Sequence, residues 1–228
     1  SVKEQTVTDW ELLVVDDQSK DTTAELVSRL AKEDPRIRLI RNEKNLGAAG
    51  SRNKAMDIAK GKYVAFLDSD DFWYPDKLEK QIALAERTDA DIVYCSYAIV
   101  DEEGRKKCPD FIVPEKTTAR STLTKTVISC STALLGKKAA SKYRFSTDYY
   151  HEDLALWLQM LNDGMIAAGV VDVLAEYRVR SNSRASNKLV AAKGRWLIYR
   201  NMMEMSFAES VVYFVIYAIK GTMKYRRG

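Results

Sequence analysis

Short apolar runs alternate with helical patterns over the first hundred residues of the chain. The runs cover residues 10–17, 36–42, 62–71 and 90–100, and the segments between them read as helices. Strands that alternate with helices in this way are typical of a parallel sheet with crossover helices. We therefore predict an α/β fold in which a mostly parallel sheet is flanked by helices.

Acidic residues end two of these runs. The first run ends in Asp16 and Asp17, and the third ends in "DSDD", which contains Asp68, Asp70 and Asp71. Because ligands of such sheets bind beyond the carboxyl ends of the strands, we expect both clusters to lie on one rim. Carboxylates this close together repel one another unless a positive charge lies among them.

A divalent cation would neutralise the acidic clusters. Mg²⁺ and Mn²⁺ prefer oxygen ligands, and such ions commonly bind one or two carboxylates together with water and substrate phosphate. His151 is the only histidine, which argues against an imidazole-rich metal site. We therefore predict a metal-bridged phosphate ester, such as a nucleoside diphosphate compound. The alternative is a solvated acidic turn that complements the start of the following helix.

Two further stretches carry candidate site residues. The stretch "NLGAAGSRN" combines small residues with Arg52, whose planar guanidinium suits phosphate. Alternatively, this helix only packs on the sheet, with Arg52 paired to Asp16 or Asp17. In "YYHEDLALWLQML" the apolar residues recur at helical spacing. Glu152 and Asp153 fall in the first turn of this predicted helix, where acids often only complement the helix dipole.

The composition narrows the classes of function. The net charge of +4 on 228 residues is too small to indicate nucleic-acid binding. The three cysteines are widely spaced without a CxxC pair, which argues against a disulfide framework or zinc knuckle and favours a reducing cytoplasm. No apolar stretch reaches the roughly 18 residues that a membrane-spanning helix needs.

The second half of the chain gives weaker patterns. We predict a turn near residues 101–107, a strand within 129–138 and one or two short strands followed by a polar loop within 165–183. From Lys188 onward the chain reads as helical. The spacing of Thr22 and Glu25, and of Ser206 and Glu209, predicts a capping box at each of two helix starts.

At "LLVVDDQSKDTT", "NLGAAGSRN", "FLDSDD", "HEDLALWLQML" and "YRVRSNSRASNK", in this order, the chain resembles family 2 glycosyltransferases. It is similar in particular to bacterial enzymes that build capsule, exopolysaccharide or teichuronic acid chains. The resemblance implies a GT-A, Rossmann-like fold. It implies inverting, metal-dependent transfer of a sugar from a nucleotide-diphosphate sugar to a saccharide or lipid-linked saccharide. We expect a GT-A domain over residues 1–185, with its nucleotide-sugar half at 1–115 and its acceptor half at 116–185, and a helical tail over 186–228.

The resemblance also implies residue roles at the donor. Asp17 would accept a hydrogen bond from the nucleotide base, and Asp16 would support its loop. Asp68 and Asp70 would form the D-x-D pair, with Asp68 near the ribose or the metal and Asp70 binding Mn²⁺ or Mg²⁺ directly. Arg52 falls where the family has a basic residue near the donor. We take a UDP-sugar as the first expectation for that donor.

At the acceptor, the resemblance makes Asp153 the general base, although a helix N-terminus should lower its basicity. The chain departs from the family in two ways. Many relatives have a histidine near "YRVR", where this chain has Arg180, which could hold a diphosphate but cannot ligate a metal. The family's first strand, which is central in its sheet, is absent from this sequence, so we expect the sequence to be a piece of the protein.

The C-terminal stretch "SFAESVVYFVIYAIKGTMKYRR" is apolar and aromatic with a basic end. It predicts an interfacial helix at the anionic inner face of the cell membrane, close to a lipid-linked acceptor. The alternatives are a helix folded back on the catalytic domain and a homodimer contact. Two other functions stay open: a sugar nucleotidyltransferase and a non-catalytic scaffold in a polymer-assembly complex.

Overall fold

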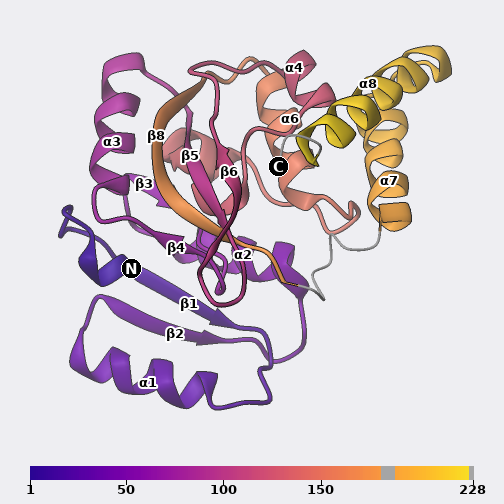
Figure 1. The fold of residues 1–228 in the computed structure, drawn as a ribbon. Helices are drawn as coiled ribbons and strands as arrows, with labels where there is room; N and C mark the ends of the chain where they lie inside the picture. Colours follow the sequence, from indigo (N-terminus) through magenta and orange to yellow (C-terminus); the bar gives the residue numbers. More distant parts are fainter. Residues whose placement is uncertain (181–187, 226–228) are drawn as a thin grey trace.

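The computed structural model describes residues 1–180 and 188–225, with side chains up to residue 220 (Figure 1). Residues 181–187, which are the "SNSRASN" part of the stretch "YRVRSNSRASNK" and include most of the predicted polar loop, lie outside the described residues. The described strands form two sheets. Strands β1 (Leu12–Asp16) and β2 (Ile37–Arg41) make a two-stranded sheet. The six-stranded sheet has the order β3-β7-β5-β8-β4, with β6 beside β5, and comprises β3 (Tyr63–Ala65), β4 (Phe72–Trp73), β5 (Ile92–Val100), β6 (Lys106–Phe111), β7 (Leu134–Gly136) and β8 (Ala167–Arg178).

Helices surround both sheets. In Figure 1, α1 lies below the small sheet, α3 lies on one side of the large sheet, and α7 and α8 stand together at the far side. The helices are α1 (Thr23–Glu33), α2 (Gly47–Ile58), α3 (Lys77–Thr88), α4 (Ala119–Thr124), α5 (Lys137–Lys142), α6 (Glu152–Asn162), α7 (Lys188–Leu197) and α8 (Phe207–Tyr225), with short helical turns at Val2–Glu4, Cys130–Thr132 and Ile198–Met202. The predicted α/β class and the helical C-terminal region are confirmed.

The strand directions correct one part of the prediction. Among the described strands, β1 with β2 and β5 with β8 are parallel, whereas β3 with β7, β4 with β8, and β5 with both β6 and β7 are antiparallel. The expectation of a mostly parallel sheet is therefore wrong. β6 returns directly from β5 through a turn at Gly104 (φ 81°), which makes that pair antiparallel. β4 and β7 are only two and three residues long, so their apolar residues give no pattern from which a parallel or antiparallel pairing could be predicted.

The core places α6 between two apolar clusters. Every residue of β5 is buried, and α6 packs against that cluster through Leu156, Trp157 and Met160. Its other side packs in a second cluster. That cluster comprises Leu123, Leu154, Ala155, Leu158, Ile198 and Tyr199. The predicted helix is thus buried on more than one face, and both clusters fix the position of its N-terminus.

The two predicted capping boxes differ in outcome. At the start of α1, Thr22 makes no side-chain capping bond, and the Thr23 backbone N–H instead donates to Asp21 at 3.0 Å, so the first prediction is wrong. At the start of α8 the box is confirmed. The Ser206 N–H donates to Glu209 at 2.9 Å, and the Glu209 N–H donates to the Ser206 hydroxyl at 3.2 Å.

We predict that Gly169→Ala destabilises the large sheet. A Cβ at this position of β8 would lie 2.2 Å from the Pro114 carbonyl oxygen and 2.9 Å from the Tyr94 ring. Because a buried strand cannot easily move away, the substitution should lower the free energy of unfolding by about 1–3 kcal/mol in urea denaturation. Gly136→Ala is the control, since its Cβ would lie 3.8 Å from the nearest heavy atom. Equal stability of the two variants would contradict this account.

Candidate functional site

The end of β1 carries the first acidic pair. Asp16 is buried, and its Oδ1 accepts a hydrogen bond of 2.9 Å from the Ser19 backbone N–H. Hydrogen bonding by Ser19 and the charge of Arg41 outweigh burial and hold the pKa of Asp16 below its ordinary value. Asp16 therefore stays ionised and braces the loop that follows β1. The same loop borders a cavity of about 460 Å³, lined by Asp16, Gln18, Ser19, Arg41, Asn42 and Glu43.

Asp17 holds the start of α2. Its Oδ1 accepts hydrogen bonds of 2.8 Å from the Asn42 side chain and the Leu46 N–H, and its Oδ2 accepts one of 2.8 Å from the Gly47 N–H. Burial alone would raise the pKa of Asp17, but these bonds lower it below the ordinary value. Both carboxylate oxygens are thus engaged within the chain.

The second acidic cluster forms a turn after β3. The Asp71 N–H donates to the Asp68 carbonyl at 3.0 Å, and the Asp68 N–H donates to the Ser131 hydroxyl at 3.0 Å. Arg178 ties this turn to β8, because its N–H donates to Asp71 at 2.9 Å and its Nε donates to the Asp70 carbonyl at 3.0 Å. The Asp68 and Asp70 side chains are 38% and 30% exposed. The backbone of the turn is therefore held in place while both carboxylates stay partly exposed.

Arginines lie beside both exposed carboxylates. The Arg180 Nε lies 3.3 Å from Asp70 Oδ2, and the Arg52 Nη2 lies 2.5 Å from Asp68 Oδ1. The alternative pairing of Arg52 with Asp16 or Asp17 is wrong, because its second contact, at 3.1 Å, is with Glu152 at the start of α6. Arg52 belongs to helix α2, and Asp17 accepts hydrogen bonds from the backbone at the start of the same helix. The two acidic clusters are thus linked through the first half of α2, as a shared rim requires.

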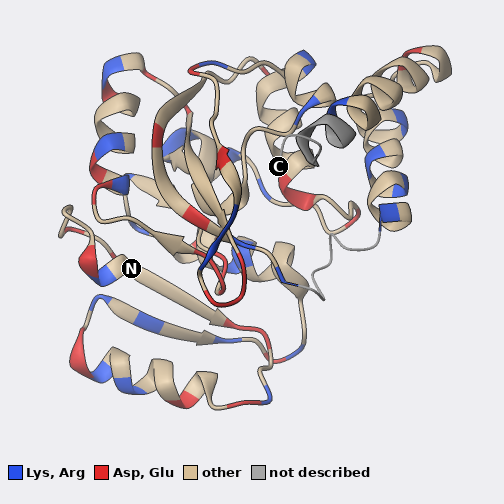
Figure 2. Cartoon of the chain, in the orientation of Figure 1, with Lys and Arg blue, Asp and Glu red and all other residues tan. Residues whose placement is uncertain are grey.

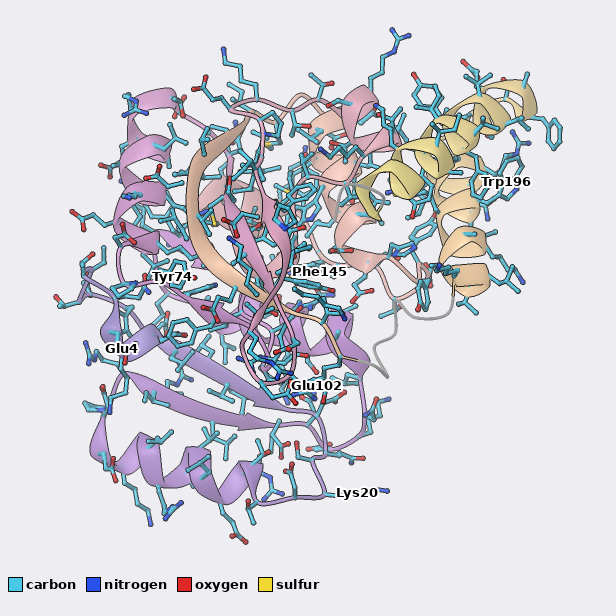
Figure 3. The ribbon with its side chains drawn as sticks, viewed as in Figure 1. Glu4, Lys20, Tyr74, Glu102, Phe145 and Trp196 are labelled. Atoms are coloured by element: carbon cyan, nitrogen blue, oxygen red, sulfur yellow. The ribbon has the colours of Figure 1, made fainter. Side chains whose placement is uncertain are left out.

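The aromatic ring of Phe145 packs against the guanidinium of Arg52. The guanidinium carbon lies 5.3 Å from the centre of the Phe145 ring. Asn53 fixes the Phe145 backbone through two hydrogen bonds of 2.8 Å, one donated by each residue. Figure 3 shows Phe145 at the centre of the molecule, and Figure 2 shows acidic and basic residues gathered around the same region.

Asp153 lies in the first turn of α6 and is half-buried. Its Oδ1 accepts a hydrogen bond of 2.7 Å from the Leu154 N–H. Burial, followed by the charge of Glu152, raises the pKa of Asp153 above its ordinary value, although Arg52 opposes this shift. This direction is opposite to the expected loss of basicity at the helix N-terminus, because burial and the charge of Glu152 raise the pKa more than the Leu154 hydrogen bond and the nearby cations lower it.

The sequence reasoning missed several residues of this site. The sequence indicates Glu152 only as a first-turn acid, and Cys130 and Ser131 only as part of a stretch, residues 129–138, that is predicted to contain a strand. Cys130 is buried beside Arg52, and burial raises the pKa of its thiol well above the ordinary value, so it stays neutral near pH 7. Arg178 was overlooked in favour of Arg180.

The acidic turn fits a divalent cation that also binds substrate. Asp68 and Asp70 offer exposed carboxylate oxygens from one turn, and Mg²⁺-type ions usually take one or two carboxylates. Over residues 1–180 and 188–225, no three His, Cys, Asp or Glu side chains come together in an arrangement that could hold a metal. A cation at this turn would need its remaining ligands from water and phosphate.

Comparison with known proteins gives a consistent family. A family model described as "Glycosyl transferase family 2" matches residues 1–145. The chain is 38% identical over 224 residues to TuaG of Bacillus subtilis, a protein named for teichuronic acid biosynthesis. The alignment covers 98% of this chain and 89% of TuaG. It is 35% identical to the Escherichia coli enzyme "UDP-Glc:alpha-D-GlcNAc-diphosphoundecaprenol beta-1,3-glucosyltransferase WfgD", with 99% of this chain and 87% of that protein aligned.

Solved structures share the fold. TarS of S. aureus in complex with UDP-GlcNAc aligns with a TM-score of 0.68 at 19% identity, over 94% of this chain. The chain spans 65% of the length of that TarS chain. The mannosyltransferase PcManGT from Pyrobaculum calidifontis, in complex with GDP-Man and Mn²⁺, aligns with a TM-score of 0.71 at 17% identity, over 100% of this chain and 70% of that one.

We predict that Asp17→Asn destabilises the fold, because an amide cannot accept at both ends as the carboxylate does. The loss should be on the order of 1 kcal/mol in urea denaturation. Asp9→Asn is the control, since Asp9 is exposed and precedes β1. An Asp17→Asn protein as stable as the control would show that the carboxylate does not hold the start of α2.

Proposed function

The chain belongs to glycosyl transferase family 2, and we propose that it transfers a sugar, with inversion, from a nucleotide-diphosphate sugar to a saccharide or lipid-linked saccharide. The observation that carries this proposal is the joining of the acidic turn to the start of α6 by Arg52. That contact brings a donor-type acidic turn and a candidate base into one site. Bacterial surface polysaccharide synthesis is the proposed setting, in keeping with the names of TuaG and WfgD.

A UDP-sugar is the proposed donor. WfgD is named for UDP-Glc, and TarS was solved with UDP-GlcNAc, whereas PcManGT was solved with GDP-Man. In this chain the donor would extend from the end of β1 to the acidic turn. We propose that Asp17 binds the base, supported by Asp16, and that Arg180 binds the diphosphate as a cation.

Asp68 and Asp70 would hold Mn²⁺ or Mg²⁺ together with the donor. A divalent cation bound there would offset the charge of the departing diphosphate. Asp70 would be the direct ligand, because its partly exposed carboxylate pairs with Arg180 at 3.3 Å, a longer contact than the 2.5 Å between Asp68 and Arg52. Asp68 is held back towards Arg52 and would lie nearer the ribose or the metal.

Asp153 is the proposed general base. It would accept the proton of an acceptor hydroxyl while that oxygen attacks the anomeric carbon from the face opposite the diphosphate. The bond from the anomeric carbon to the diphosphate oxygen breaks as the new bond forms, which inverts that carbon. The raised pKa of Asp153 suits this role, since a more basic carboxylate takes the proton more readily. Holding donor and acceptor in line supplies much of the acceleration.

The C-terminal helices offer a surface for a lipid-linked acceptor. One face of α8 packs in the second apolar cluster through Tyr213 and Phe214, so the helix is folded back on the domain. Its opposite face exposes between 38% and 55% of each of four apolar residues: Val211, Val212, Val215 and Ile219. Phe207, at the start of the helix, is 67% exposed, and its ring contacts Trp196 of α7 at a centroid distance of 5.7 Å. Leu189 of α7 is 83% exposed, and Figure 2 shows basic residues along α7.

None of the described helices combines the length and apolar character that crossing a membrane requires. We propose that the exposed face of α8 lies on the surface of an anionic membrane, with basic residues beside it. This would place the protein in the cytoplasm, at the inner face of the cell membrane. A homodimer that covers the same face is the competing outcome.

Asp153→Asn should reduce transfer by about 10²–10⁴-fold, because the amide cannot take the acceptor proton. Binding of UDP, measured by calorimetry with Mn²⁺, should be unchanged. Asp148→Asn is the matched control, since Asp148 is an exposed acid on the loop just before α6. Transfer retained by Asp153→Asn would mean that another residue is the base. Absence of both turnover and UDP binding in the wild type would favour a non-catalytic scaffold.

Val212→Glu combined with Val215→Glu should weaken binding to anionic liposomes at least ten-fold in co-sedimentation, because two apolar side chains are replaced by acids. Val171→Glu is the control, because Val171 is a similarly exposed valine that lies on β8 and not on α8. Wild-type protein that does not bind the liposomes would overturn the membrane proposal. A dimer that dissociates on the double substitution would identify the face as a contact between copies.

A further inference from the structure

Arg52 is built into its position rather than free to follow a ligand. Its side chain is only 17% exposed, and the Phe145 ring lies beneath its guanidinium at 5.3 Å. That ring is fixed in turn by edge contacts with Phe66, at a centroid distance of 5.1 Å, and with Trp157 of α6, at 6.2 Å. Helix α2, the segment before α6 and α6 itself therefore converge on this cation.

The two ends of the guanidinium serve two different acids. Nη1 contacts Glu152 at 3.1 Å and Nη2 contacts Asp68 at 2.5 Å. The Glu152 side chain is 12% exposed, so this ion pair is shielded from water more than a surface pair. The planar fork of arginine presents one nitrogen to each carboxylate and so fixes the direction of both contacts.

We infer that Glu152 is a positioning residue: by holding one end of Arg52 it fixes the start of α6, and with it Asp153, against the acidic turn after β3. This inference rests on the proposed function, in which Asp153 is the base. A first-turn acid that only complemented the helix dipole would not need burial or a partner a hundred positions away. Glu152 has both.

Glu152 also sets the electrostatic surroundings of Asp153. Its negative charge favours the protonated form of Asp153, whereas Arg52 favours the ionised form. With Glu152 in place, the charge of Arg52 is shared and lowers the pKa of Asp153 less. Among the described residues, Asp153 also interacts electrostatically with His151 at its own helix start, Cys130 in the turn before β7 and Tyr177 of β8.

Opposite shifts in a pH profile test this inference. In Glu152→Gln the charge that raises the pKa of Asp153 is lost, so the acid limb of kcat should move to lower pH, with a lower plateau. In Arg52→Gln the charge that lowers this pKa is lost, so the limb should move to higher pH. Each profile is measured at saturating donor and acceptor. Glu152→Asp keeps the charge and should keep the limb in place.

Glu25→Gln is the control for Glu152→Gln, since Glu25 is an exposed first-turn acid of α1. It should leave the profile unchanged. UDP binding should survive Glu152→Gln, because Asp68 keeps its contact with Arg52. An unmoved limb in folded Glu152→Gln, or shifts of both variants in the same direction, would overturn the inference. If either Glu152→Gln or Arg52→Gln does not fold, the direction of the pH shift in the other variant tests the inference. Transfer retained by Asp153→Asn would instead refute the proposed base.

Discussion

The site depends on how one buried cation compensates acids from distant parts of the chain. Asp68 follows β3 and Glu152 begins α6, and both contact Arg52 of α2. Without a positive charge between them these two carboxylates would repel each other. A second arginine, Arg180, approaches Asp70 at the open side of the same turn. Each carboxylate of the acidic turn therefore has an arginine beside it, the largely buried Arg52 at Asp68 and the exposed Arg180 at Asp70.

Helix α2 carries this arrangement. Asp17, which follows β1, accepts hydrogen bonds from the N–H groups at the start of the helix. About one turn later, the Arg52 side chain extends from the helix to the acidic turn after β3 and to the start of α6. Asn53, the next residue, fixes the segment before α6. One helix thus connects the small sheet, the acidic turn and the proposed base, and the proposed in-line transfer would require these parts to keep a fixed spacing.

The sequence predicted what periodicity and local chemistry control. The strands around Val14, Leu39 and Tyr94, the helix that begins at Glu152 and the capping box at Ser206 were all foreseen from neighbouring residues. Long-range contacts were not. The partner of Arg52 lies a hundred positions away, burial of Asp153 comes from packing on both sides of α6, and the direction of the short strands follows from turns rather than from apolar runs.

The most direct measurement is a crystal structure of the protein with UDP and Mn²⁺ bound. The account predicts that the diphosphate lies at the turn of Asp68 and Asp70, with Arg180 beside it, while Arg52 still contacts both Asp68 and Glu152. Asp153 would then face the open side of the donor. A diphosphate bound away from this turn, or an Arg52 that has left Glu152 to bind it, would contradict the claim that one fixed cation joins donor and base.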